Sequence, residues 1–485
     1  MSREREQKLF DAITLIRDDL VEDAQNGLSK PSRPAWRVWA AAACAVLAVG
    51  LGVWRVLPLL GGSAGGGDGT GGGAFMSYAG PVLPLTIAGE AEGLTAERAV
   101  IYDLSLPSGD SVRVSGAGVE DSYILTNHTA EDRTVTALYP FASSFQELET
   151  LIPAVTVDGA AVQPALRAGA YGESRDLKSW EEYQSLLATG NDQAGAHSSG
   201  PTLDQRVTVY EFTDFNAPWE EYPAATQAIS FRIDPERTAV LSYGFNGYSW
   251  DEKGDLQFSY FVPDGSSGRP ERKVLLVLGD DLDSYTLQGY QDGGRNPGDE
   301  IDGVSAAVTR REAALSDVTA ELTSDFFGQY GGGAFPSGVS PELFAGMLAR
   351  SLVQSGVLDY QGSGTYVSLE DFISDVNGCR RVLCLEFPVT IPAGGSAAVT
   401  ARLHKDPSRD YAGARSSKAD IQGYDLAVSL GSNLPLTSLT AELTHAEHIE
   451  IVNQNFGFDL PGGVSKVSLD PAQERYYFEL KPLKR

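Results

Sequence analysis

The sequence predicts a mainly β protein with one N-terminal transmembrane helix, followed by a multi-domain antiparallel β-sandwich ectodomain with a small helical insertion. Three observations support this fold class. An uncharged apolar segment lies near the N-terminus, a Gly-rich segment follows it, and short alternating apolar runs then recur between turn residues. A chain of 485 residues is also too long for a single core, so we expect several domains.

The apolar segment is predicted to span a membrane. Residues 38–54 carry no charge and the run continues past Arg55, so residues 36–60 are just long enough to cross a bilayer. Tryptophans lie near both ends, where amphipathic rings favour the interface. Three basic residues precede the segment closely: Lys30, Arg33 and Arg37. Because only Arg55 follows before Arg98, the positive-inside rule places the N-terminus in the cytoplasm and the C-terminal part outside the cell.

Three other interpretations of this segment stay open. A cleaved signal peptide has a short basic region before its apolar part, whereas a long, partly acidic stretch precedes this one. A lipoprotein signal ends at a cysteine, and small residues do precede Cys44, but the apolar run continues well beyond it. A buried core helix is the third alternative, and the Gly-rich segment directly after the run argues against it.

Residues 1–35 are predicted to form a cytoplasmic segment with an amphipathic helix and a basic stretch. Four apolar residues recur at helical spacing between charged ones: Leu9, Ile13, Ile16 and Leu20. They share one face of a helix, and so short a segment cannot bury that face by itself. We therefore predict that residues 8–24 bind a cytoplasmic regulatory protein through these side chains.

Residues 61–74 are Gly-rich and of low complexity, which predicts a flexible linker. Within it, residues 67–72 match the GxGxxG pattern of dinucleotide sites. That pattern needs a strand before it and an amphipathic helix after it, and neither is predicted here. We therefore predict no cofactor.

Strand patterns dominate the sequence after the linker. Apolar and alternating runs occur at 99–106, 122–126, 134–139 and 154–157, and the last runs into an Asp158-Gly159 turn. We assign residues 75–204 to a first β-sandwich domain. Similar runs between 206 and 309 place a second β domain at 205–330.

Two helices are predicted next. Ser340 supplies an N-cap and Pro341 a first helical residue. Four apolar residues then trace one helical face: Leu343, Met347, Leu348 and Leu352. Ser368 opens a second short helix. We assign residues 331–376 to a helical insertion and residues 377–485 to a C-terminal β region.

The charge of the chain restricts its partners. It holds 37 Lys and Arg against 65 Asp and Glu, a net charge of −28, and residues 1–60 are almost neutral. A surface of that sign repels phosphate backbones, so we predict no nucleic-acid partner. The extracellular ligand is left unidentified, with cations, basic peptides and neutral glycans as the remaining classes.

Cysteine is sparse, so the chain has no disulfide framework. Cys379 and Cys384 are the only cysteines outside the apolar segment. If both lie on one strand, their side chains point to opposite faces, because five is an odd spacing. We favour two reduced, buried thiols, and a disulfide between them stays open.

No catalytic residue is predicted. The stretch Gly247-Tyr248-Ser249-Trp250-Asp251 lacks the second glycine of a GxSxG nucleophile turn and lies among strands. A polar hairpin corner is the simpler interpretation. A Walker-type phosphate loop is also missing from the sequence.

Two groups of residues are weak metal candidates. His445 and His448 flank Glu447, but two positions three apart on a strand face opposite sides and cannot share a zinc ion. Carboxylates suit calcium better, and Asp280, Asp281 and Asp283 follow an apolar strand. A second acidic group lies in a Gly-rich stretch: Asp292, Asp299, Glu300 and Asp302. Solvated acidic loops are the alternative for both groups.

Aromatic residues occur beside acids in two short stretches. These are Trp180-Glu181-Glu182-Tyr183 and Trp219-Glu220-Glu221-Tyr222. They could line a sugar-binding groove, or they could pack their rings inward. A glycan hydrolase would need two opposed carboxylates, which the sequence alone does not single out.

The stretch LFDAITLIRDDLVEDA, the basic residues after it and the single apolar segment resemble anti-sigma-factor-like single-pass proteins of Gram-positive bacteria. The resemblance covers residues 8–60. Because no His or Cys precedes Cys44, it implies a type without a zinc site. It implies a surface sensor whose ectodomain binds a ligand and whose cytoplasmic helix docks a regulatory partner. A structural or adhesive envelope protein is the alternative, and a glycan hydrolase is the third.

Overall fold

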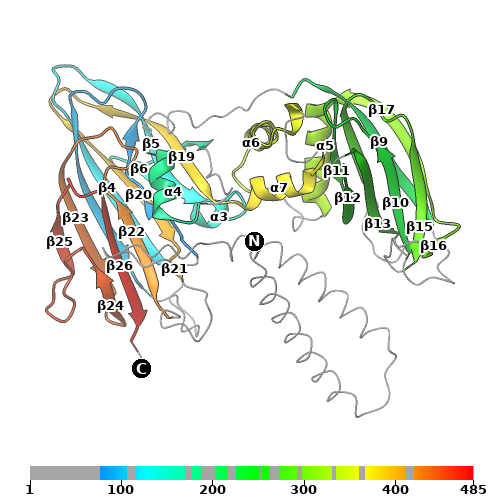
Figure 1. Cartoon of the computed structure of the whole chain (residues 1–485). Helices are drawn as coiled ribbons and strands as arrows, with labels where there is room; N and C mark the ends of the chain where they lie inside the picture. The colour runs from blue at the N-terminus through cyan, green and yellow to red at the C-terminus, as the bar shows by residue number, and fades with distance from the viewer. Residues whose placement is uncertain are drawn as a thin grey trace, which may run out of the picture. The chain divides into compact units, whose positions relative to one another are not determined.

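The computed structural model describes residues 77–105, 116–169, 177–187, 203–216, 225–251, 253–262, 272–291, 298–329, 335–359, 366–409 and 420–483. This part of the chain is mainly β, which confirms the predicted fold class at that level (Figure 1). None of the helices in these ranges is both long enough and apolar enough to cross a membrane. The predicted membrane helix at 36–60, the linker at 61–74 and the cytoplasmic helix lie outside the described residues.

Strands from both ends of the described chain build three sheets, which we call A, B and C. Sheet C has the order β25-β23-β3-β4-β20-β6-β7, with β3 at Leu94–Asp103, β4 at Ala117–Asn127, β6 at Ala154–Val157, β7 at Ala160–Ala161, β20 at Ser396–Lys405, β23 at Leu436–Thr444 and β25 at Lys466–Leu469. Sheet B has the order β2-β5-β19-β8, with β2 at Thr86–Ile87, β5 at Arg133–Ser143, β8 at Ala165–Ala168 and β19 at Arg381–Ile391. Sheet A has the order β1-β22-β26-β24, with β1 at Pro81–Val82, β22 at Gln422–Ala427, β24 at Ile449–Gln454, β26 at Arg475–Pro482 and β21 at Ser408–Arg409 beside β22.

Sheet C packs one face against both other sheets. Its strands bury every second residue, because successive side chains of a strand point to opposite faces. Val100 and Val119 of sheet C share a buried cluster with Leu426 of sheet A. Farther along the same face, Leu125 packs in a second cluster with Leu385 of sheet B. The result is a two-layer β-unit with sheets A and B on one side of sheet C.

Sheets B and C join stretches that the sequence analysis assigned to different domains. β5 pairs with β19, β4 with β20, and β3 with β23. Residues 75–204 and 377–485 therefore contribute to one β-unit instead of two successive domains. The periodicity of a strand indicates which face it buries, but it does not indicate which distant strand it pairs with.

The middle of the chain forms a second β-sandwich from sheets D and E. Sheet D has the order β17-β9-β14-β11-β18, with β9 at Arg206–Asn216, β11 at Thr238–Tyr243, β14 at Lys273–Gly279, β17 at Ser305–Ala314 and β18 at Tyr366–Ser368. Sheet E has the order β12-β13-β10-β15-β16, with β10 at Ala225–Arg232, β12 at Gly247–Trp250, β13 at Asp255–Val262, β15 at Tyr285–Gln291 and β16 at Glu300–Ile301. Phe212 and Leu275 of sheet D pack against Ile229 and Phe258 of sheet E.

Helices pack on the other face of sheet D. These are α5 (Leu315–Gln329), α6 (Pro341–Gln354), the 3-10 turn η1 (Val357–Asp359) and α7 (Leu369–Gly378). The side chain of Ser340 accepts a hydrogen bond from Leu343 N at 3.1 Å, and that of Ser368 accepts one from Asp371 N at 3.2 Å. Both predicted helix starts are confirmed. Helix α5, however, lies within 205–330, which was predicted as β throughout, although Val318 and Leu322 are spaced for a helix.

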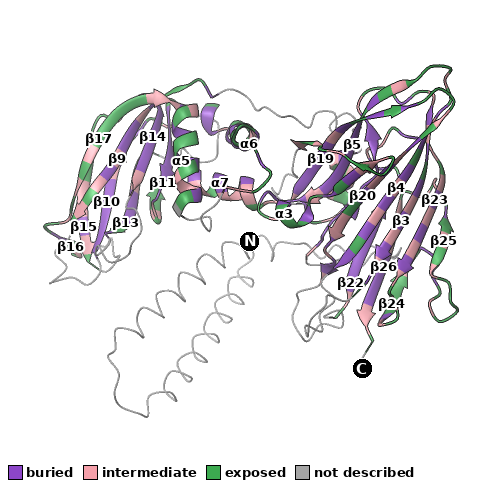
Figure 2. Cartoon of the chain, turned by 180° about the vertical axis from the view of Figure 1, so that it is seen from behind, coloured by how far each residue is buried: buried purple, intermediate pink, exposed green. Residues whose placement is uncertain are grey.

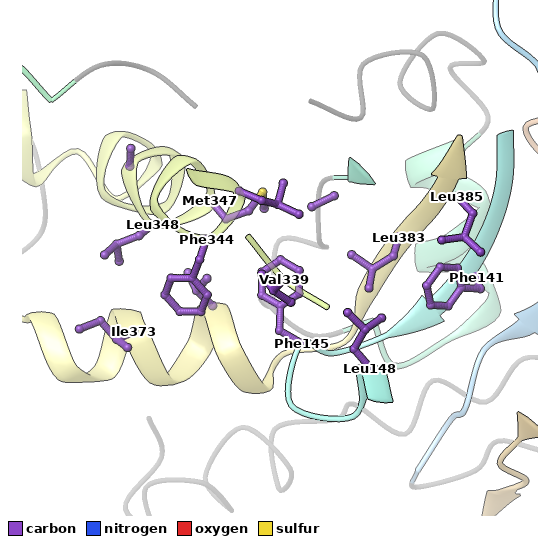
Figure 3. Close-up of a cluster of buried hydrophobic side chains, with 14 of the residues drawn as sticks. Phe141, Phe145, Leu148, Val339, Phe344, Met347, Leu348, Ile373, Leu383 and Leu385 are labelled. Atoms are coloured by element: carbon purple, nitrogen blue, oxygen red, sulfur yellow. The ribbon is translucent and has the colours of Figure 1, made fainter. Parts of the chain in front are cut away.

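The helices and the first β-unit share one hydrophobic cluster (Figure 3). Phe145, which precedes the short helix α3 (Leu148–Leu151), packs against Phe344 of α6 with ring centroids 5.8 Å apart. Phe344 also contacts Phe327 of α5, with centroids 5.3 Å apart. The helical layer therefore packs against both sheet D and residues of the first β-unit.

Candidate functional site

The outer face of sheet E, opposite sheet D, is the candidate site. Leu256, Phe258 and Tyr260 of β13 point into the sandwich, so the residues that alternate with them point outward. Together with their neighbours in register, they define this outer face: Thr226, Ala228, Ser230 and Arg232 on β10, Ser249 on β12, Asp255, Gln257, Ser259 and Phe261 on β13, Thr286, Gln288 and Tyr290 on β15, and Glu300 on β16. Figure 2 shows these strands with partly and fully exposed residues between buried ones.

A row of polar side chains crosses the face. The strand register places Ser249, Gln257, Ser230 and Thr286 next to one another on four adjacent strands. Gln257 Nε2 donates to Ser230 Oγ at 3.0 Å, which agrees with their common face. Amide and hydroxyl groups of this kind both donate and accept hydrogen bonds. The row is therefore suited to a ligand with several hydroxyl or amide groups.

A second row combines aromatic rings with one buried hydroxyl. Phe261, Thr226 and Tyr290 are neighbours in register on β13, β10 and β15. Phe261 is 45% exposed, whereas Thr226 is buried. Thr226 Oγ1 has no hydrogen-bond partner among the described residues. One exposed ring is ordinary, but a buried unpaired hydroxyl beside it is unfavourable until a ligand or water bonds to it.

An open groove of about 550 Å³ lies at one end of the face. Its lining includes polar residues of the outer face and also Trp250, which is 44% exposed and pairs with the inward-facing Leu256 at the edge of the sheet. Arg232 Nε lies 4.0 Å from Asp255 Oδ1 across the strands, and both side chains are more than half exposed. The groove therefore combines an aromatic ring with the Arg232–Asp255 pair, the further carboxylate of Asp251, and uncharged donors and acceptors.

The β12–β13 hairpin builds this end of the sheet. Asp251 Oδ1 accepts hydrogen bonds from Asp255 N at 3.0 Å and from Lys253 N at 2.9 Å, and these two bonds lower the pKa of Asp251. Gly254 has a φ of +86°, and a Cβ there would lie 2.1 Å from Ile233 O, so only glycine fits. Residues 247–251 therefore form a strand that leads into a β-hairpin turn. A GxSxG nucleophile turn would instead join a strand to a helix.

The calcium candidates pair with arginines. Asp280 lies 2.5 Å from Arg237 Nη2, and Asp281 lies 2.6 Å from Arg310 Nη2. Burial raises the pKa of Asp281, but hydrogen bonds from Arg310 and Tyr210 outweigh burial and lower that pKa. Among the described residues, no three His, Cys, Asp or Glu side chains are grouped as metal ligands.

The other polar candidates are also separated. His445 Nδ1 lies 2.8 Å from Asp103 Oδ1, and His445 has a φ of +53° in the turn after β23. Glu300 accepts a hydrogen bond from Gly298 N at 2.6 Å, whereas Asp292 lies outside the described residues. These contacts give His445 and Glu300 partners within the protein.

The first aromatic–acidic stretch packs inward. Helix α4 (Trp180–Leu187) buries Trp180 and Tyr183 against Val382 and Cys384 of β19. The guanidinium of Arg475 lies 4.8 Å from the Trp180 ring centroid. The inward-packing alternative is therefore confirmed for this stretch. The stretch at 219–222 lies outside the described residues.

The two cysteines are both free thiols. Cys379 caps the C-terminus of α7, and Cys384 lies in β19, so they are not on one strand as the sequence analysis assumed. Burial raises the pKa of Cys384 to about 12, which makes it an unreactive core residue.

Buried charges of the first β-unit were missed by sequence reasoning. Arg98 Nε lies 2.8 Å from Asp121 Oδ1, and both side chains are fully buried. Lys405 Nζ donates to Ala79 O at 2.6 Å. The cavity beside Lys405 measures only about 10 Å³, which is room for one water at most. These groups are therefore buried parts of the β-unit and do not form an open site. The sequence did carry a signal for these buried charges, because Arg98 and Asp121 occupy strand positions whose neighbours two residues away are apolar and point inward.

The candidate site depends on its geometry alone. No protein-family model matches this chain, and no curated protein matches it. The predicted partner-binding residues Leu9, Ile13, Ile16 and Leu20 lie outside the described residues.

Proposed function

We propose that the chain is a single-pass membrane surface protein with an extracellular ligand-binding ectodomain and an anti-sigma-like cytoplasmic helix that docks a regulatory partner. The outer face of sheet E is its ligand-binding surface. This proposal is carried by the combination on that face of the exposed Phe261 ring, a polar row and an unpaired buried hydroxyl, with an open groove at the end of the face. Such a surface binds without catalytic residues, so we propose that the protein is not an enzyme.

The attachment of residues 77–87 to the first β-unit supports a tethered ectodomain. These residues closely follow the Gly-rich segment 61–74 in sequence. Ser77 and Arg409 exchange two backbone hydrogen bonds of 2.8 Å, β1 pairs with β22, and β2 pairs with β5. Asn433 Oδ1 accepts a bond from Ile87 N at 3.0 Å. A force applied through the linker would therefore act on paired strands of sheets A and B.

The proposed signalling role predicts a partner for residues 8–24. Replacing Ile13 and Ile16 together by Asp should abolish capture of a cytoplasmic protein by residues 1–35, because each buried apolar side chain contributes roughly 1.5–3 kcal/mol. Affinity purification with the unaltered and the doubly substituted segment, followed by mass spectrometry, measures this loss. Membrane insertion of the full chain should not change, because both substitutions precede residue 36.

A structural or adhesive envelope protein is the second candidate, and the double attachment of residues 77–87 to sheets A and B favours it as well. The same purification separates the two functions. If the unaltered segment captures no protein that the double variant loses, the signalling role fails and the adhesive function becomes the better account.

A further inference from the structure

We infer that a cavity between helices α5 and α6 binds an uncharged small molecule with an alkyl chain. This site goes beyond the proposed ligand-binding face, because the cavity lies in the helical layer and shares no residue with sheet E. The inference follows from the size and length of the cavity, the chemistry of its lining and the character of its mouth.

The cavity has the size of a small-molecule pocket. It measures about 460 Å³, and such pockets commonly measure about 300–1,000 Å³. Its lining runs along α5 from Thr319 to Gly328 and along α6 from Pro341 to Leu348. At about 1.5 Å per residue, these stretches are about 13 Å and about 10 Å long. An extended decyl chain has a similar length, so a single alkyl chain matches the cavity.

The floor of the cavity is apolar. The rings of Phe327, Phe335 and Phe344 contact one another pairwise, with centroids 5.1, 5.3 and 5.4 Å apart. Leu348 adds an aliphatic side chain, and Phe344 and Leu348 both belong to the cluster shown in Figure 3. An apolar cavity of about 150 Å³ is already enough to bind benzene. A larger cavity of the same character favours an apolar ligand with more carbon atoms.

The polar groups of the lining do not select a polar ligand. Thr319 Oγ1 donates to Ser316 O at 3.0 Å, and Thr323 Oγ1 donates to Thr319 O at 2.7 Å, so both buried hydroxyls already have partners in α5. None of the described residues that line the cavity is charged. A sugar or an ion would therefore lose bonds to water that the cavity does not replace. The net charge of −28 also disfavours an anionic chain such as a fatty acid.

The mouth of the cavity suits a small molecule better than a protein. A Cβ atom added to Gly328 would meet no atom within 4 Å, so the space beside it is open. Within the described ranges, α5 exposes no large apolar side chain, and Val353, which α6 exposes, does not line the cavity. A protein partner would therefore find no apolar patch around the mouth to cover. The exposed lining residues are all small or cyclic: Ala320, Ser324 and Gly328 on α5, and Pro341 and Ala345 on α6.

Photoaffinity labelling of the full-length chain in lipid nanodiscs tests the inference. The probe is 1-decanol with a diazirine on its chain, and mass spectrometry identifies the labelled peptides. We expect label on peptides of α5 and α6. An excess of unlabelled 1-decanol should remove this label, and an equal excess of decanoate should remove less of it. The inference is overturned if these helices carry no label that 1-decanol removes, or if decanoate competes as well as or better than 1-decanol.

Gly328→Leu tests whether the label depends on free space in the cavity. The added side chain should reduce labelling by about tenfold or more, because it occupies the volume of the ligand. The melting temperature should not fall, because leucine is a better helix former than glycine. Gln354→Leu is the matched control, because it adds the same side chain at an exposed residue of α6 that does not line the cavity. Equal losses of label in the two variants would contradict the site.

Thr323→Val tests whether the ligand is bound through its alkyl chain. Because the Thr323 hydroxyl already donates within α5, its removal should leave labelling unchanged. A loss as large as that expected for Gly328→Leu would show that the ligand needs this hydroxyl, which would overturn the assignment of an alkyl chain. None of these results depends on sheet E or on membrane topology, so the proposed function can stand when this inference fails.

Discussion

Replacing Asp121 by alanine is expected to lower the free energy of unfolding by about 3–5 kcal/mol, because it leaves the guanidinium of Arg98 buried without a counter-ion. Arg98 Nε and Nη2 donate to the two carboxylate oxygens at 2.8 and 2.9 Å. Tyr123 and Tyr139 donate to the same carboxylate at 3.1 and 3.0 Å, so two buried hydroxyls also lose their acceptor. Urea denaturation of residues 75–485, followed by circular dichroism, measures the change.

An exposed pair on the same strand gives the control. Glu120 of β4 lies 2.8 Å from Arg402 of β20, with side chains 37% and 61% exposed. Because water screens such a pair, Glu120→Ala should change stability by about 1 kcal/mol or less. Replacing both Arg98 and Asp121 by apolar residues should be far milder than Asp121→Ala alone. Equal losses for Asp121→Ala and Glu120→Ala would contradict this account of the core.

The pH dependence of stability should change when Lys405 is replaced by Met. Burial, with a smaller contribution from Arg380, lowers the pKa of Lys405 to about 7, although Asp406 and Asp425 act in the opposite direction. An unfolded chain keeps this lysine protonated up to about pH 10. Between these pH values the unfolded state binds more protons than the native state, so Lys405 makes stability rise with pH.

The expected size of this effect is large enough to measure. Lys405→Met removes the titrating amine and keeps a stem of similar length. Relative to the variant, the wild-type protein should gain about 2 kcal/mol between pH 7 and pH 9, because the slope rises from about half of 1.4 kcal/mol per pH unit at the native pKa to the full value above it. Urea denaturation at several pH values gives the difference. A difference that stays constant across this range would show that Lys405 does not lose its proton in the native state.

Individual elements could be predicted from the sequence where local chemistry determines them. The caps at Ser340 and Ser368 formed as predicted, because a hydroxyl satisfies a free backbone N–H wherever the helix begins. The strand at 154–157 and its turn were also predicted correctly, since Asp158 and Gly159 both adopt positive φ values, of 48° and 80°.

Long-range pairing could not be predicted in the same way. The site depends on the register of β10 with β13, which brings Thr226 beside Phe261, although the two residues lie far apart in sequence. The burial of Arg98 could not be predicted for the same reason. Its carboxylate partner lies on sheet C, and a backbone carbonyl that it bonds lies on sheet A. Phe261 itself carried a usable signal, since it is an apolar residue at a position where the alternation of β13 points outward.

The side of the membrane on which residues 75–485 lie is the most direct test of the proposed function. Reporters fused after residue 75 should be active outside the cell, and reporters fused before residue 30 should be active inside, because Lys30, Arg33 and Arg37 precede the apolar segment. The reverse pattern would contradict the account, because the outer face of sheet E could then not meet an extracellular ligand.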